Sequence, residues 1–385
     1  MLMQSDTPRS PADYRRHPRR IRIPSLTILR RLLAAILAAV MLTLAVSYGR
    51  ALTYPGEAPL DVRTVDWIRE NGGAPLVNAV ENWWYTRQAP PTSAPDPTLG
   101  SAGPVAAAPG TPAPLPAIGP RAAPGEGTWV AGPSSKNGTP PLLATFVRPD
   151  PVHPGVVAGV ARFDQNLVKA QLIAGTREPD KRQWPEGGQV PLDQRGSLVA
   201  TFNSGFKLAE ARGGFYADSR GAQPLRDGAA SLVIDRAGRV SVGAWGRDVR
   251  MSPDVAAVRQ NLALIVDNGA PVPGLDVNSD NRWGSAKNQL QYTWRSALGV
   301  DARGNLFYVG GNQLTLASLA RALADTGAVR GMELDIHPRM VHLYAYQHVN
   351  GQPQPLANPL LPTMQGPLDR YLQPDQRDFV SVTLR

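Results

Sequence analysis

The chain has 385 residues, of which 42% are hydrophobic, and it contains 38 prolines, 37 glycines and no cysteine. This length allows one large domain or two medium ones with appendages, and the lack of cysteine excludes disulfides, thiol nucleophiles and cysteine-ligated metals. Of the net charge of +9, +6 lies in residues 1–31, which hold eight arginines and two aspartates, so +3 remains for the other 354 residues. The folded part has no basic stripe interleaved with aromatic residues, and we therefore expect no nucleic-acid partner.

Residues 1–31 form a basic tail that precedes an uncharged apolar segment of 18 residues, 32–49. A helix of this length spans about 27 Å, close to a hydrocarbon core about 30 Å thick. Arginines precede the segment and few basic residues follow it closely, which favours a cytoplasmic N-terminus. We predict a single-pass transmembrane helix in the cell membrane with an extracytoplasmic C-terminal domain. A cleaved signal peptide, whose apolar region is shorter, is the alternative.

Residues 50–88 are predicted to form a juxtamembrane helical segment, interrupted at Asn71-Gly72-Gly73. It could be a collar that packs on the main domain, or an amphipathic segment on the membrane surface, where Trp83 and Trp84 would sit well. Residues 89–126 follow, with 11 prolines, 10 alanines and 5 glycines. Such a composition cannot bury enough apolar surface to offset the entropy of ordering, so we predict a disordered, extended linker.

The remaining residues, 127–385, alternate short β-rich runs with turn residues. Hairpin loops are predicted at 235–239 and 301–305, and a helix at 316–325, capped by Thr315 and ended by Gly327. This pattern predicts an α+β domain with a mixed, mainly antiparallel sheet and a few packed helices. The predicted strands in the first part of the domain are 142–147, 156–163, 167–174, 198–202, 231–234, 240–244 and 262–266.

A further predicted strand, residues 332–340, carries several chemically active side chains. Because side chains alternate along a strand, Glu333, Asp335 and His337 are expected on one face, with Cα atoms about 6.5–7 Å apart from one to the next. Clustered carboxylates can divide the roles of acid and base. The three residues could equally form the solvated face of a half-buried strand, or a site for a hard metal ion.

Three motifs occur in a characteristic order: Asn203-Ser204-Gly205-Phe206, Arg295-Ser296-Ala297-Leu298-Gly299 and Leu334-Asp335-Ile336-His337-Pro338. Together they resemble motifs of the phosphodiester glycosidase family, and the resemblance covers about residues 198–347. In that family the last motif usually reads Leu-Asp-Gly-Gly-Gly-Ser. The present chain keeps the aspartate and has Ile336-His337-Pro338 in place of the glycines.

The resemblance implies a hydrolase that frees a sugar from a sugar-1-phosphodiester on an envelope glycan or wall glycopolymer. In this interpretation Asp335 and Glu333 supply the acid and base, with His337 beside them. The implied substrate-binding residues are Asn203, Gly205, Phe206, Arg295 and Arg226. No cofactor is predicted, although a divalent cation is compatible with the residues, and the metal ligands stay unknown.

Other roles stay open for these residues. Asn203 could orient a sugar hydroxyl, hold Asp335, or simply end a strand at a turn. Arg295 could bind phosphate in a bidentate manner, or form an ion pair with Asp267 or Asp301. The rival function for the whole domain is a non-catalytic module that binds or scaffolds envelope glycopolymer, which the replacement of the glycines by Ile336-His337-Pro338 favours.

Overall fold

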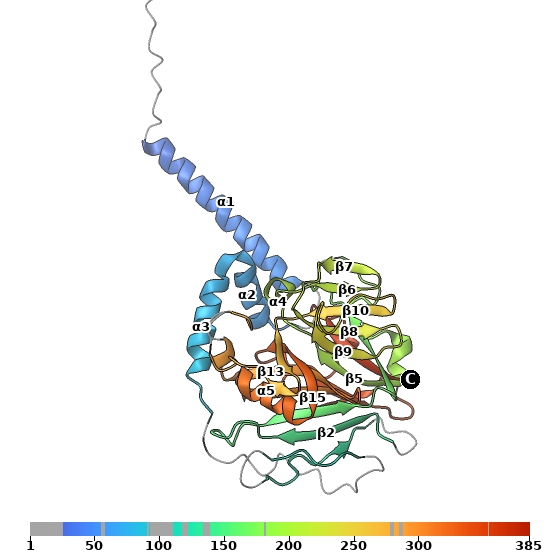
Figure 1. Cartoon of the computed structure of the whole chain (residues 1–385). Coiled ribbons are helices and arrows are strands. Elements are labelled where there is room, and N and C mark those ends of the chain that lie inside the picture. Colours follow the sequence, from blue (N-terminus) through green and yellow to red (C-terminus); the bar gives the residue numbers. More distant parts are fainter. Residues whose placement is uncertain are drawn as a thin grey trace, which may run out of the picture. The chain divides into compact units, whose positions relative to one another are not determined.

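The computed structural model describes residues 26–54, 58–90, 92, 111–117, 122–133, 139–180, 182–277, 281–284, 288–352 and 354–385 (Figure 1). The chain divides into two compact units, Met1–Thr53 and Tyr54–Arg385. Most of the predicted basic tail and of the predicted linker 89–126 lies outside the described residues. In the second unit, the helices after Tyr54 and the sheets after residue 127 belong together.

The first unit contains one described helix, α1 (Leu26–Thr53), which includes the whole predicted span 32–49. None of its residues is buried, and its leucines, isoleucines and valines are largely exposed. The helix is long and apolar enough to cross a membrane. Twenty-eight residues at 1.5 Å each give a length of about 42 Å, which exceeds the hydrocarbon thickness of a bilayer.

The second unit starts with α2 (Leu60–Ile68), the short π-helix η1 (Arg69–Gly73) and α3 (Ala74–Thr86). The break falls at the predicted position, because Asn71 and Gly72 leave the helical conformation and Gly72 has a φ of +89°. A positive φ of this kind is readily adopted only by glycine. The result is a helical hairpin, residues 60–86, whose two arms contact each other.

Most of the regular secondary structure in the described part of the second unit is antiparallel β-sheet, as the sequence predicts. In the described part of the chain, the largest sheet has the order β1-β2-β3-β14-β13-β15-β11-β12. Its strands are β1 (Val130–Ala131), β2 (Leu142–Val147), β3 (Ala158–Phe163), β11 (Leu264–Asp267), β12 (Ala270–Pro271), β13 (Thr293–Asp301), β14 (Leu306–Leu314) and β15 (Ala328–Ile336).

Two smaller antiparallel sheets complete the β-structure of the described residues, with the orders β7-β6-β10-β8-β9 and β17-β16-β5-β18-β4. The first contains β6 (Phe215–Ala217), β7 (Arg220–Gln223), β8 (Ala230–Asp235), β9 (Val240–Ala244) and β10 (Val255–Gln260). The second contains β4 (Val168–Ile173), β5 (Leu198–Asn203), β16 (Leu343–Gln347), β17 (Leu356–Pro359) and β18 (Phe379–Leu384). The chain is therefore α+β with antiparallel sheets and few helices.

The helix α5 (Leu316–Asp325) occupies the residues predicted for it, with Thr315 and Ser318 forming a reciprocal capping box. Its apolar face packs on β13, β14 and β15. The helix can approach the sheet closely because Gly331 has no side chain. A Cβ atom at this position would lie only 2.3 Å from Leu323 Cδ2. In the described residues, four further short helices connect strands, namely α4 (Leu208–Ala211) and the 3-10 turns η3 (Leu192–Ser197), η4 (Asn288–Leu290) and η5 (Arg370–Leu372).

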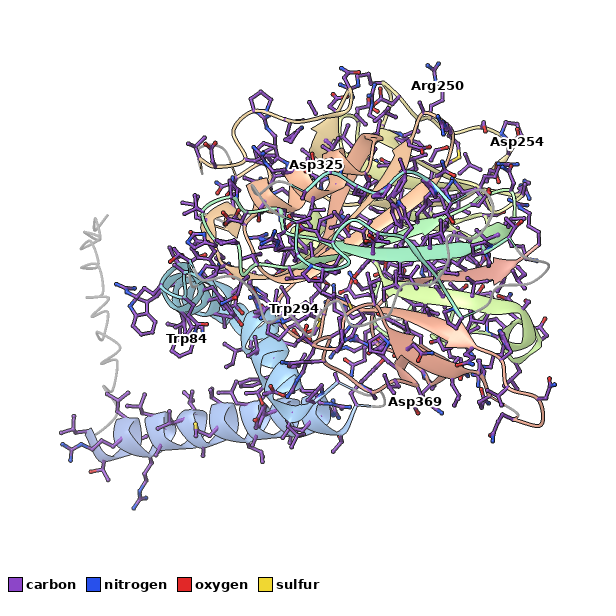
Figure 2. The ribbon with its side chains drawn as sticks, turned by 90° about the horizontal axis from the view of Figure 1, so that it is seen from below. Trp84, Arg250, Asp254, Trp294, Asp325 and Asp369 are labelled. Carbon is purple, nitrogen blue, oxygen red and sulfur yellow. The ribbon has the colours of Figure 1, made fainter. Side chains whose placement is uncertain are left out.

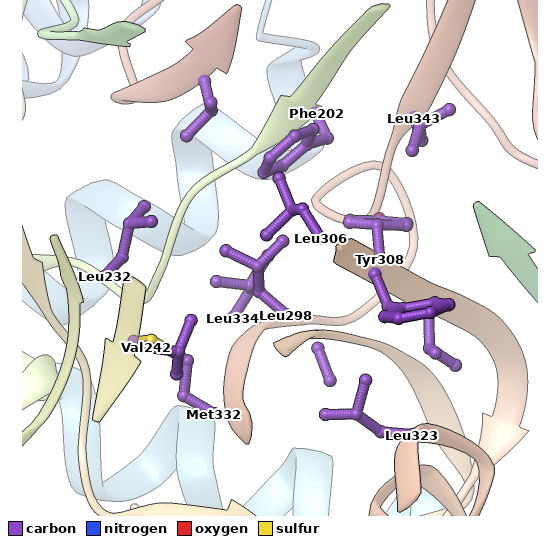
Figure 3. Packing of buried hydrophobic residues seen from close by; sticks show 14 of the residues in the cluster. Phe202, Leu232, Val242, Leu298, Leu306, Tyr308, Leu323, Met332, Leu334 and Leu343 are labelled. Atoms are coloured by element: carbon purple, nitrogen blue, oxygen red, sulfur yellow. The ribbon is translucent and has the colours of Figure 1, made fainter. Parts of the chain in front are cut away.

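The largest apolar core of the described residues contains side chains from all three sheets. Figure 3 shows Phe202 of β5, Leu232 of β8, Leu298 of β13 and Leu334 of β15 converging in it. All four side chains are at most 1% exposed. This common core fixes the end of β15 relative to the loop that follows β5, and these two segments carry two of the three sequence motifs.

Candidate functional site

A cavity of about 490 Å³ lies between the helical hairpin 60–86 and the C-terminal end of β15. The hairpin contributes a polar wall that includes Arg69, Glu81 and Tyr85. The sheet side contributes the segment from Asp335 to Met340, together with Phe206 and Arg377. The last motif of the sequence therefore opens into a cavity whose other wall comes from the helical hairpin 60–86.

A β-bulge aims Asp335 into this cavity. Arg295 pairs with Ile336, and Ala297 pairs with Glu333. The two paired positions are three residues apart on β15 but only two apart on β13, so β15 has one extra residue here. Such an extra residue interrupts the alternation of side chains and can redirect one of them. The Asn261 amide holds the distorted strand by donating to the carbonyl oxygens of Glu333 (2.9 Å) and Leu334 (2.8 Å).

This bulge corrects the expectation that Glu333, Asp335 and His337 share one face of a regular strand. Glu333 is completely buried, and it is absent from the described residues that line the cavity. The strand also ends at Ile336 rather than at 340. His337 adopts a left-handed φ of +79°, and Pro338 supplies no backbone N–H to continue a ladder.

The Asp335 carboxyl group sits between a backbone donor and an arginine. Its Oδ1 accepts a hydrogen bond from the Ile336 N–H (2.8 Å), and its Oδ2 accepts one from Arg377 Nη2 (2.9 Å). Burial raises the pKa of Asp335 to about 7, although the nearby charge of Arg377 opposes this shift. The group is therefore partly protonated near neutral pH, as a proton donor must be.

Like Glu81 and Tyr85, Arg377 is one of the cavity residues that the sequence motifs did not indicate. Its Nη2 also donates to the Gly205 carbonyl oxygen (2.9 Å), while its Nε is buried without a hydrogen-bond partner. Arg377 precedes β18, and Phe379 of that strand pairs with Asn203 of β5. This long-range pairing brings Arg377 to the motif 203–206. The only local signal is a charged run, residues 375–378, directly before an apolar strand.

His337 connects the sheet side of the cavity to α3. Its ring stacks on Tyr85, with centroids 5.0 Å apart and planes inclined by 23°. Its Nε2 lies 3.5 Å from a Glu81 carboxylate oxygen, and its Nδ1 lies 3.2 Å from Thr293 Oγ1. Burial alone would raise the pKa of Glu81, but His337 and Arg69 together lower it below its usual value. Glu81 is therefore ionised at neutral pH.

Arg295 and Glu333 form an ion pair inside the large sheet. Arg295 Nη1 lies 2.6 Å from Glu333 Oε1, and both side chains are only 1% exposed. Arg295 Nε also donates to the Leu314 carbonyl oxygen at 2.9 Å. Burial raises the pKa of Glu333, opposed by the charge of Arg295. The partner of Arg295 is thus Glu333, rather than Asp267 or Asp301, and neither member of the pair lines the cavity.

The motif 203–206 holds part of the backbone that lines the cavity. The Asn203 amide oxygen accepts hydrogen bonds from Tyr308 Oη (2.9 Å) and the His342 N–H (3.0 Å), and its Nδ2 donates to Ser296 Oγ (2.9 Å). Ser296 Oγ in turn donates to the Asp335 carbonyl oxygen at 3.2 Å. Asn203 therefore positions the backbone of Asp335, and its own polar atoms are already engaged.

The remaining predicted residues divide between the cavity and the surface. Phe206 lines the cavity, and the carbonyl oxygen of Gly205 receives Arg377. Arg226 is exposed and is not among the lining residues. In the described part of the chain, no group of three histidine or carboxylate side chains could hold a metal ion, so Glu333, Asp335 and His337 form no such cluster.

No family profile and no curated protein sequence matches the chain. Among solved structures, the chain is similar to the catalytic domain of zebrafish N-acetylglucosamine-1-phosphodiester alpha-N-acetylglucosaminidase, auto-inhibited by its pro-peptide. The two share 13% identity and a TM-score of 0.42, over 67% of this chain and 87% of that one.

Two further solved structures resemble the chain. A hypothetical protein from Synechocystis has 14% identity and a TM-score of 0.36, over 65% of this chain and 63% of that one. A putative exported protein from Burkholderia pseudomallei has 12% identity and a TM-score of 0.30, over 62% and 75%. All of these likenesses concern the fold alone.

Proposed function

We propose that the chain hydrolyses a sugar-1-phosphodiester in the cavity at Asp335, freeing the sugar while the phosphate stays on an envelope glycan or wall glycopolymer. One observation carries the proposal: a buried carboxyl group with a pKa of about 7 faces the cavity and touches Arg377, which has an unused donor. A proton donor beside a cation suits a leaving group that carries a phosphate. The motif resemblance around Asp335 points to the same reaction class.

The proposed reaction breaks the bond between C1 of the sugar and the phosphate oxygen. Asp335 gives its proton to that oxygen, and the oxygen of a water molecule bonds to C1. Glu81 is the carboxylate that accepts the proton of this water, because it lines the same cavity and stays ionised. A pair of carboxyl groups with pKa values shifted apart is the usual basis for dividing the two roles.

Arg377 contacts the phosphate in this proposal. Its Nη2, which reaches Asp335 at the cavity, can donate to a phosphate oxygen, and the charge of the guanidinium attracts the phosphate. The buried pair of Arg295 and Glu333 supports the strand that carries Asp335. Asn203 holds the same strand through Ser296.

The proposed cellular setting is supported by α1. The helix is long and apolar enough to cross a membrane, and arginines precede its apolar stretch. With the basic tail in the cytoplasm, the cavity lies on the extracytoplasmic side, where envelope glycans and wall polymers are found. The orientation belongs to the proposal.

The test is release of free sugar by the detergent-solubilised full chain. The substrates are the methyl ester of N-acetylglucosamine-1-phosphate and an envelope glycopolymer with sugar-1-phosphodiester links. We expect Asp335→Asn to lower kcat at least a hundredfold, because the amide cannot give a proton. The control Asp254→Asn removes an exposed carboxylate and should keep full activity. Equal turnover by the wild type and Asp335→Asn would contradict the proposal.

The same assay separates the alternatives. Saturable binding of the glycopolymer without any product would instead support a binding or scaffolding module. Loss of turnover on adding a chelator, restored by a divalent cation, would show that a metal ion takes part in the reaction.

A further inference from the structure

The helix α3 has two opposite faces that differ in polarity. Positions 78, 81, 82 and 85 lie on one side of the helical wheel, and positions 76, 80, 83, 84 and 87 lie on the other. The side that meets the protein is polar, and the side that meets solvent is apolar. A surface helix of a water-soluble domain shows the reverse arrangement.

The inner face is occupied by polar contacts. Glu81 pairs with Arg69 (2.5 Å) and approaches His337. Asn78 accepts a hydrogen bond from Arg69 Nη1 (2.7 Å), and the Tyr85 carbonyl oxygen accepts one from the Tyr292 N–H (3.3 Å). These contacts fix the rotation of α3 about its axis, so the apolar side cannot turn inward without breaking them.

The outer face is a contiguous apolar patch. Leu76 is 67% exposed, Val80 54%, Trp83 55% and Trp84 52%. The two indole rings lie 6.1 Å apart, and the guanidinium of Arg87 lies 5.0 Å from the centroid of the Trp83 ring. Figure 2 shows Trp84 on the side of α3 that is turned away from the sheets. A helical stripe with tryptophans and one arginine matches the composition of the bilayer interface.

We infer that this outer face of α3 docks on the surface of the lipid bilayer in which α1 is anchored. The argument rests on chain continuity: only six residues, 54–59, separate the end of α1 from Leu60. Fully extended, such a connection spans about 20–25 Å, so a membrane-inserted α1 keeps α2 and α3 close to the headgroup region. Tryptophans and leucine enter that region, and Arg87 meets anionic phosphates.

The chain itself offers a poor alternative cover for this face. The segment that directly follows α3, residues 89–126, is composed largely of proline, alanine and glycine and contains no aromatic residue. It has few large apolar side chains with which to bury two indole rings. The inference is independent of the reaction proposed above, because it concerns the opposite face of the helix.

The test uses the lack of cysteine in the chain. Val80→Cys in the full chain carries a fluorescent label, and the protein is reconstituted in vesicles of phosphatidylcholine and phosphatidylglycerol. Val152→Cys is the matched control, since Val152 is also an exposed valine (65%) but lies in the sheet domain. Met41→Cys in α1 reports insertion. Quenching is measured with nitroxide lipids and with iodide on both sides of the membrane.

We expect the label at residue 80 to be quenched by nitroxide lipids at least threefold more than the label at residue 152, and by iodide at least threefold less. Trp83→Ala with Trp84→Ala should remove most of this difference while the label at residue 41 stays lipid-quenched. Equal iodide quenching at residues 80 and 152 would overturn the inference. Protection from iodide without lipid quenching would also overturn it, because a second copy or another protein would then cover the face. Absence of lipid quenching at residue 41 would overturn it as well.

Discussion

Asp335 shows how a few atoms set the protonation of one carboxyl group. Burial raises the pKa of the Asp335 carboxyl to about 7, and the charge of Arg377 limits the rise. Asp335 and Glu81 line the same cavity, yet their pKa values are shifted in opposite directions. Glu81 has two partners that favour its charge, Arg69 and His337, whereas Asp335 has one arginine and a more buried position.

The raised pKa of Asp335 has a consequence for stability. Between about pH 4 and pH 7 the native state keeps a proton that the unfolded state, with a pKa of 3.8, has released. The free energy of unfolding therefore falls as the pH rises through this window, by up to about 1.4 kcal/mol per pH unit from this group. Urea denaturation at pH 4.5 and 6.5 should show the fall in the wild type and a smaller fall in Asp335→Asn. Identical pH dependence in both would contradict the assigned pKa.

The buried pair of Arg295 and Glu333 is predicted to act on stability. Glu333→Gln leaves the arginine charge buried and uncompensated, which should cost about 3–5 kcal/mol. Replacing both residues by methionine should cost much less than the sum of the costs of Glu333→Met and Arg295→Met alone. Thermal and urea denaturation of the wild type, these two single variants and the double variant measures this coupling. Unchanged stability of Glu333→Gln together with loss of turnover would instead assign Glu333 to the chemistry.

At the scale of elements, local signals in the sequence placed α5 and several strands well. Thr315 caps the helix and the apolar spacing sets its face, so both ends of Leu316–Asp325 follow from nearby residues. The hairpin loops at 235–239 and 301–305 are likewise local. The sequence predicted Asp335 as a site residue, but it could not reveal the bulge, because Asn261 holds it from 72 positions away. The sequence did not predict Arg377 either, because a long-range contact, the pairing of β18 with β5, brings it to the site.

A further prediction concerns the Asn261 amide, which holds the bulge. Asn261→Ala removes three hydrogen bonds: it leaves the carbonyl groups of Glu333 and Leu334 without this donor and the Phe206 N–H without its acceptor. We expect a loss of about 1–3 kcal/mol in the free energy of unfolding, and at least a tenfold loss of kcat because Asp335 is no longer held in place. Asn358→Ala, at an exposed amide, is the control and should change neither quantity. Full activity of Asn261→Ala would show that the bulge does not need this amide.

At the scale of the whole molecule, the helices 60–86 and the sheets share one compact unit and together line the cavity at Asp335. Ion pairs bind the hairpin to the sheet domain: Asp66 with Lys207 (2.7 Å), Glu70 with Arg177 (2.9 Å), Arg69 with Glu210 (3.2 Å) and Asp61 with Arg339 (2.8 Å). The predicted linker 89–126 thus joins two parts of the same unit. Composition distinguishes linker from domain, but it does not tell which segments pack together.

This arrangement predicts that residues 127–385 alone lack part of the proposed site. Residues 127–385 lack one wall of the cavity, including Glu81, Arg69 and Tyr85. We expect at least a hundredfold lower kcat/KM for this fragment than for residues 54–385, with both fragments checked for folding by circular dichroism. Equal activity of the two folded fragments would show that the hairpin does not belong to the site.

The most direct test of the account is the pH dependence of kcat/KM for sugar release by the full chain. A proton donor with a pKa of about 7 predicts a plateau on the acidic side of that value and a tenfold fall per pH unit above it. Asp254→Asn should give the same profile, and Asp335→Asn should lose both the rate and the alkaline limb. A rate that stays constant from pH 6 to pH 9, or an Asp335→Asn variant with the wild-type profile, would contradict the assignment of Asp335 as the acid.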